Sequence, residues 1–125
     1  MSQATSANSV VKTFVASGIV HAGHIVELDA GGTVSENNGA NTGIGVYLGD
    51  ADCAANDHIE VCILGPCKVW ADGAGAIVPG AYVASDGNGH AVVEANAGDR
   101  VLGVALEALA AGTAYIEILV CHHTI

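Results

Sequence analysis

An internal duplication is the feature that most constrains how this chain can fold. Three pairs of segments align at an offset of 57 or 58 positions: 22–32 with 79–89 (79 − 22 = 57), 43–48 with 101–106 (101 − 43 = 58), and Ile59-Glu60 with Ile116-Glu117 (116 − 59 = 57). The pseudo-repeats span about 17–65 and 73–120. Each is a small unit of roughly three strands that cannot bury its apolar face alone, so two such units are expected to close on each other.

The secondary structure predicted for both repeats is β. The apolar residues are mostly Val, Ile and Ala, and the chain has 17 Gly but only two Pro. β-Branched residues favour strands, and turn signals every eight to twelve residues or so are typical of a sandwich or barrel. The runs expected to form strands are 10–16, 24–29, 43–48, 59–64, 68–71, 76–78, 81–86, 90–95, 100–106 and 114–120. One short run of helix formers, 105–111, predicts a single helical turn at most.

Four glycines have a structural interpretation. Gly32 and Gly89 lie in turns with Asp29 or Asn88 and are expected to need a positive φ. Gly45 and Gly103 lie inside predicted strands, where glycine usually marks a bulge or the close approach of another backbone. These two positions are the expected corners of a barrel.

The predicted organisation is therefore an all-β fold, a small β-barrel or β-sandwich built from two pseudo-repeated β-units. Residues 1–12 are expected to form an extended N-terminal arm that orders against another molecule, and residues 13–125 a single β domain. No apolar run is long enough for a membrane helix, and the first residues lack the pattern of a secretory signal. A soluble protein made in the cytoplasm is expected.

The charge balance argues against one class of partner. Thirteen acidic residues against three basic ones give a formal net charge of −10. Such a surface repels a phosphate backbone, so direct binding to nucleic acid is not expected. The carboxylates are scattered along the chain, which indicates a solvated surface.

The cysteines and histidines leave one alternative open, a small metal- or ligand-binding β-barrel. The residue types that could bind zinc are Cys53, Cys62, Cys67, Cys121, His58, His122 and His123. Their spacing is poor for zinc, and buried thiols that act as small apolar side chains are the favoured interpretation, ahead of disulfides and metal. His21, His24 and His90 are expected to face solvent or to lie in turns.

No pattern of catalytic residues emerges. A nucleophile, a histidine and a carboxylate do not occur in any familiar catalytic string, and the carboxylate pairs Asp50/Asp52 and Glu27/Asp29 suit a solvated strand edge. Trp70 lies between the repeats and is expected either to plug the junction or to anchor a partner. A protein without enzymatic activity and without a cofactor is the expectation.

The order of the motifs resembles a known family. AGHIVELDAGGTV, GIGVYLGDA, IEVCILGPCKVWA, AIVPGAYVASDGNGHAV, GDRVLGVALEALAAG and YIEILV occur in this order over about residues 15–120. The chain resembles the small capsid decoration, or cement, proteins of tailed bacteriophages with a DUF2190-like pattern.

The resemblance implies a structural virion protein on the outer capsid surface, synthesised in the host cytoplasm. Such proteins stabilise the phage head by binding between neighbouring major capsid proteins, commonly as homotrimers, and the family offers no catalytic residues to carry over. The residues expected at the interface are Val10, Val11, Lys12, Phe14 and Trp70. Neither a membrane nor a nucleic acid is an expected partner.

Overall fold

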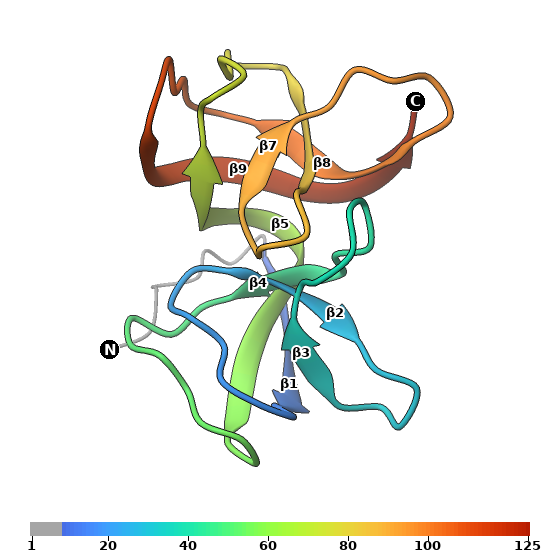
Figure 1. Cartoon of the computed structure of the whole chain (residues 1–125), viewed down its shortest axis with the longest axis vertical. Helices are drawn as coiled ribbons and strands as arrows, with labels where there is room; N and C mark the ends of the chain where they lie inside the picture. The colour runs from blue at the N-terminus through green and yellow to red at the C-terminus, as the bar shows by residue number, and fades with distance from the viewer. Residues whose placement is uncertain (1–8) are drawn as a thin grey trace.

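The computed structural model describes residues 9–125, and within them the fold is all-β, as predicted (Figure 1). Its nine strands are β1 (Val10–Val15), β2 (Ile25–Leu28), β3 (Val34–Glu36), β4 (Gly45–Tyr47), β5 (His58–Asp72), β6 (Tyr82–Ser85), β7 (Ala91–Val93), β8 (Arg100–Ala105) and β9 (Thr113–Thr124). In this part of the chain we find no helix that could cross a membrane.

The first repeat forms a ring of five strand segments. β1 and β4 both pair antiparallel with the first part of β5, β4 pairs with β2, and β2 pairs with β3. A parallel bridge between Ala16 and Val34 links the end of β1 to β3. This ring occupies the lower half of the molecule in Figure 1.

The second repeat forms the same ring with the equivalent strands. The second part of β5 pairs with β9, β9 with β8, β8 with β6, and β6 with β7. A parallel pairing of Ala91 in β7 with Ala71 in β5 closes the ring. Each repeat thus closes on itself with five strand segments where roughly three were expected, since β1 and β3 complete the first ring and β5 contributes a segment to both.

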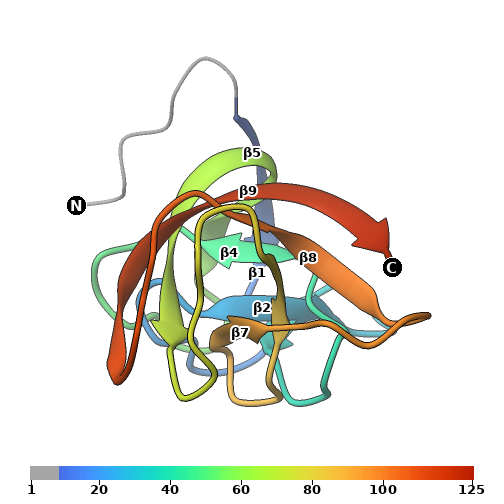
Figure 2. The same cartoon turned by 90° about the horizontal axis from the view of Figure 1, so that it is seen from above.

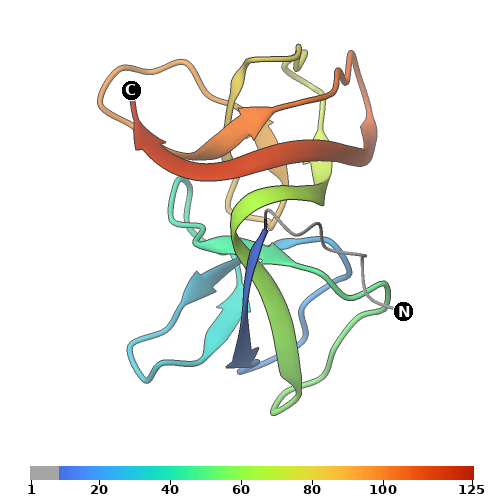
Figure 3. The same cartoon turned by 180° about the vertical axis from the view of Figure 1, so that it is seen from behind.

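β5 is one continuous strand where the sequence predicted two, at 59–64 and 68–71. Gly65 has φ +100°, and pairing with β9 continues through it, since Gly65 lies opposite Val120 and Pro66 opposite Leu119. Viewed from above and from behind, β5 curves out of the first ring and continues beside β9 (Figures 2 and 3). The Gly-Pro step bends the strand without ending it.

The core shows why the two rings stay together. Neighbouring residues on first-repeat strands point in opposite directions, yet both are buried, as with Ile25 and Val26 or Val61 and Cys62. Val26, Tyr47, Ile59 and Val61 belong to a cluster made by the first repeat alone. Ile25, Val46, Leu48 and Cys62 belong to a larger cluster with side chains of the second repeat, which include Val69, Val83 and Ile118. The two repeats therefore do bury apolar surface against each other.

The glycine predictions are confirmed. Gly32 and Gly89 have φ values of +88° and +78°. A Cβ at Gly45 would collide with the carbonyl oxygen of Cys62, and one at Gly103 with that of Leu119. The register of β8 against β9 also shifts between Val101 and Gly103.

Three local predictions need correction. The run 105–111 contains no helical turn, because Leu109 instead exchanges two backbone hydrogen bonds of 2.9 Å with Ile77. The strand expected at 76–78 does not form, and only Ile77 pairs, in an isolated bridge with Leu109. β3 was missed because the polar sequence after Val34 suggested a loop.

Candidate functional site

β1 carries most of the residues predicted to form an interface. Val10 lies opposite Leu64 of β5, and both side chains are exposed, by 46% and 48%. Further along β5, Pro66 lies opposite Leu119, which is also exposed. These three side chains, Val10, Leu64 and Leu119, are called the apolar strip below. The strip lies where β5 passes from one ring to the other.

The other predicted residues of β1 point in different directions. Val11 packs against the larger core cluster and Phe14 against the smaller one. Lys12 is exposed, and its Nζ lies 5.6 Å from the centroid of the Phe14 ring. β1 is thus held to the body of the protein by two side chains and presents Val10 and Lys12 outward. Residues 1–8 of the predicted arm lie outside the described residues, whereas 10–12 belong to β1.

Trp70 lies at the junction of the two repeats. Its ring meets that of Tyr115 edge to face, with centroids 4.9 Å apart. The Trp70 backbone N–H donates to Gly23 O at 2.9 Å, and the Tyr115 hydroxyl donates to Ala22 O at 3.1 Å. Both bonds join the second repeat to the 21–24 turn of the first, and the indole is half-buried against this junction.

A polar loop of the first repeat makes a second connection between the rings. The Asn37 side chain is buried, donates to Gly39 O and Thr42 Oγ1 at 2.9 Å each, and accepts a hydrogen bond from Gly87 N at 3.0 Å. Asn41 Nδ2 donates to Glu94 Oε1 at 2.8 Å. Residues 37–43, which lie in the gap between the strands expected at 24–29 and 43–48, are called the polar clasp below.

The two carboxylates of the Glu27/Asp29 pair have structural roles. Glu27 Oε1 accepts hydrogen bonds from the clasp, including one of 2.6 Å from Asn38 N. Asp29 accepts hydrogen bonds from Ser35 and Ser17 at 2.9 Å each and from Thr33 at 3.1 Å. Partial burial alone would raise the pKa of Asp29, but these three hydroxyls together lower it below its usual value.

The cysteines behave largely as apolar side chains. Cys53, Cys62 and Cys67 are buried, and Cys121 is partly exposed. The Cys62 and Cys67 thiols are hydrogen-bonded to each other, which lowers the pKa of Cys62 and, together with burial, raises that of Cys67. None of the four cysteines, nor His58, His122 or His123, joins any group of three metal-binding side chains among residues 9–125.

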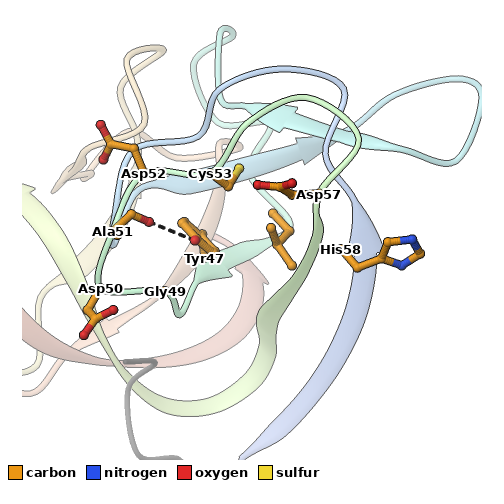
Figure 4. A pocket seen from close by; sticks show the side chains of 9 residues that line it. Tyr47, Gly49, Asp50, Ala51, Asp52, Cys53, Asp57 and His58 are labelled. Atoms are coloured by element: carbon orange, nitrogen blue, oxygen red, sulfur yellow. Dashed lines mark hydrogen bonds between the residues drawn. The ribbon is translucent and has the colours of Figure 1, made fainter.

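A hollow of about 330 Å³ lies beside β4 and the loop that follows it (Figure 4). The described residues lining it include Asp50, Asp52, Asp57 and His58. The Tyr47 hydroxyl donates to Ala51 O at 2.9 Å, and Cys53 Sγ donates to Gly18 O at 3.8 Å. In Figure 4, Asp50, Asp52 and His58 turn away from Tyr47. These side chains therefore do not converge as a nucleophile, a base and an acid would.

A known protein structure shares this arrangement of strands. The fold is similar to the crystal structure of the head fiber gp8.5 N base in bacteriophage phi29, with a TM-score of 0.65 and 21% sequence identity over 94% of this chain and 98% of that one. No curated protein sequence matches the chain. Residues 6–122 match the family described as phage cement protein. Because this match spans nearly the whole chain, the protein belongs to the phage cement protein family and has a structural, capsid-associated role in the virion.

Proposed function

We propose that this protein binds the outer surface of a phage head where neighbouring major capsid proteins meet, and that it stabilises the assembled lattice. The family match over residues 6–122 carries the proposal. A protein that binds the assembled lattice but not its free subunits lowers the free energy of the assembled state. This role needs no catalytic group and no cofactor, so we propose a structural protein rather than an enzyme.

The apolar strip supports a specific contact surface. Val10 and Leu64 are exposed and lie directly opposite each other on paired strands, so their side chains are on the same face of the sheet. Exposed apolar side chains that lie side by side favour association with another protein. Of the five residues expected at the interface, Val10 and Lys12 are therefore the best candidates for direct contact, while Val11 and Phe14 hold β1 in place.

The N-terminal segment is proposed to add to the same contact. Ser9 Oγ donates to Pro66 O at 2.7 Å, which holds Ser9, the residue before β1, at the bend of β5. An arm that orders on binding contributes a wide contact from few residues. We propose that the arm lies across a neighbouring subunit of a homotrimer or across the capsid, after synthesis of the protein in the host cytoplasm.

Binding to purified heads that lack the protein tests this function. Wild-type protein is expected to co-sediment with the heads and to raise the temperature at which they release their contents. The double variant Val10→Asp/Leu64→Asp is expected to lose most of the binding, because two charges replace the apolar contact. Val78→Asp is the matched control, since Val78 is 58% exposed and lies in the second repeat.

The outcomes of this experiment test the proposed capsid role and the proposed contact surface separately. Wild-type protein that does not sediment with the heads contradicts the capsid role. Equal loss of binding in the double variant and in Val78→Asp contradicts the proposed surface alone. Native mass spectrometry of the free protein tests the trimer, and a monomer both free and on the heads would refute it.

A further inference from the structure

Three histidine rings stand in a row at the junction of the two repeats. The centroids of His21 and His24 are 5.2 Å apart, and those of His24 and His90 are 5.1 Å apart. The sequence separates His90 widely from the other two, and all three were expected to face solvent or turns. Their juxtaposition arises because the 21–24 turn of the first repeat packs against the turn between β6 and β7 of the second, where Ile25 N donates to Gly89 O at 2.8 Å.

Two of these rings converge on a single carboxylate. His21 Nδ1 lies 2.8 Å from Glu36 Oε1, and His24 Nδ1 lies 3.1 Å from the same oxygen. Pairing of β2 with β3 places Glu36 opposite Val26, next to the turn that carries both histidines. The three groups offer donor atoms that all lie within 4.8 Å of one another.

The nitrogen of His24 that faces Glu36 has no hydrogen-bond partner among the described residues. The atom is fully buried, and although Glu36 Oε1 lies 3.1 Å away, the geometry does not make a hydrogen bond. A buried nitrogen without a hydrogen-bond partner is costly, and a cation bound between His24 Nδ1 and Glu36 Oε1 would give both atoms a ligand contact.

His21 has the surroundings of a metal ligand on its other nitrogen. Its Nε2 lies 3.8 Å from Asp52 Oδ2, and Asp52 is itself held by a hydrogen bond of 3.0 Å from Ala22 N to Oδ1. Histidines that bind metals through one nitrogen commonly direct the other toward a carboxylate, which orients the ring and makes the ligand more basic.

We propose that His21, His24 and Glu36 form a binding site for a divalent transition metal of the zinc class. Two imidazoles and one carboxylate are a common three-residue ligand set for Zn²⁺. Bonds of about 2.1 Å in tetrahedral geometry place ligand atoms roughly 3.4 Å apart, so the nitrogen–oxygen distances of 2.8 and 3.1 Å need to lengthen only slightly. The half-exposed ring of His21 leaves a fourth position open to water.

A second group of donors nearby is less suitable. Asp72, Asp86 and His90 also lie within reach of one another. Asp86 Oδ2 already pairs with His90 Nδ1 at 3.0 Å, and its Oδ1 accepts hydrogen bonds from Asn88 N and His90 N at 2.7 and 3.1 Å. These atoms all have partners. In the first group, Glu36 Oε1 is bonded to His21 N and Nδ1 at 2.9 and 2.8 Å, but His24 Nδ1 has no hydrogen-bond partner within residues 9–125.

Metal titration of the full chain tests the site. Chelator-treated wild-type protein is expected to bind one Zn²⁺ per chain by calorimetry, to give the visible absorption bands of tetrahedral Co²⁺, and to show a Tm raised by several degrees with Zn²⁺. Glu36→Gln and His21→Ala are expected to weaken binding at least tenfold. Glu36→Gln keeps the shape of the side chain, and circular dichroism of each metal-free variant checks its fold. His58→Ala is the control, because His58 is exposed and belongs to neither group of donors.

Several results would overturn the site. These are an absence of saturable binding, binding that Glu36→Gln and His21→Ala leave unchanged, and binding that is lost only in His90→Ala, which would move the ion to the Asp86 group. The proposal is independent of the capsid role, because head binding is measured in a separate assay and can succeed whether or not the metal binds.

Discussion

The buried Asn37 side chain of the first repeat accepts a hydrogen bond of 3.0 Å from the backbone N–H of Gly87 in the second. Asn37 also holds its own loop through Gly39 and Thr42. A single amide therefore orders the polar clasp and joins it to the other ring.

Replacing Asn37 by alanine is expected to lower the free energy of unfolding by about 1 to 3 kcal/mol, because the buried amide loses its hydrogen bonds to partly buried partners. Urea denaturation followed by circular dichroism measures the change. Asn38→Ala is the control, since the Asn38 side chain is exposed and only its backbone N–H bonds to Glu27. Equal stability of the two variants would mean that the clasp contributes little.

Gly103→Ala is expected to destabilise the protein by about 1 to 3 kcal/mol, because the new methyl group would meet the carbonyl of Leu119 and push β8 away from β9. Gly18→Ala is the matched control, since a Cβ there has no neighbour within 4 Å. Thermal unfolding of both variants gives the comparison. A Gly103→Ala protein as stable as Gly18→Ala would show that the strands separate at little cost.

Acid is expected to lower the free energy of unfolding, in part because Asp29 becomes protonated. Its folded pKa lies below its usual value, so its charged form contributes stability that is fully present above the unfolded pKa of about 3.9 and is lost as the pH falls through the folded pKa. Urea denaturation between about pH 2 and pH 6 measures this dependence. Asp29→Asn should flatten part of this dependence. An unaltered profile in Asp29→Asn would count against the three hydroxyl contacts.

Cysteine reactivity is expected to follow burial. Cys121 is partly exposed, while Cys53, Cys62 and Cys67 are buried. Ellman's reagent should therefore modify Cys121 fastest in the folded protein and reach the other three at comparable rates only in denaturant. Cys121→Ser is expected to remove the fast phase. A fast phase that persists in Cys121→Ser would show that the core opens readily.

Local patterns in the sequence were sufficient to predict much of the fold. The duplication, the strand runs and the glycine positions depend on neighbours in the chain or on the constant offset between repeats, and these predictions are confirmed at Gly32, Gly45, Gly89 and Gly103. The continuity of β5 could not be predicted in this way, because Gly65-Pro66 has the composition of a turn and remains in the strand only through pairing with β9.

The functional features were harder to predict because their partners are distant in sequence. Asn37 meets Gly87, and His24 meets His90, only after the two rings have packed together. No short spacing marks either contact. The apolar strip was predicted only in part: Val10 was expected at the interface, whereas Leu64 and Leu119 were not, because nothing local in the sequence marks their exposure.

The shared strand has a mechanical consequence for a capsid-associated protein. β5 takes part in both rings, so a load applied to one ring reaches the other along covalent backbone and not only across side-chain contacts. Pulling the rings apart would require β5 to be stripped from β1 and β4, or from β9, with many hydrogen bonds broken in parallel. Tension that would separate two merely adjacent domains is thereby spread over the whole molecule.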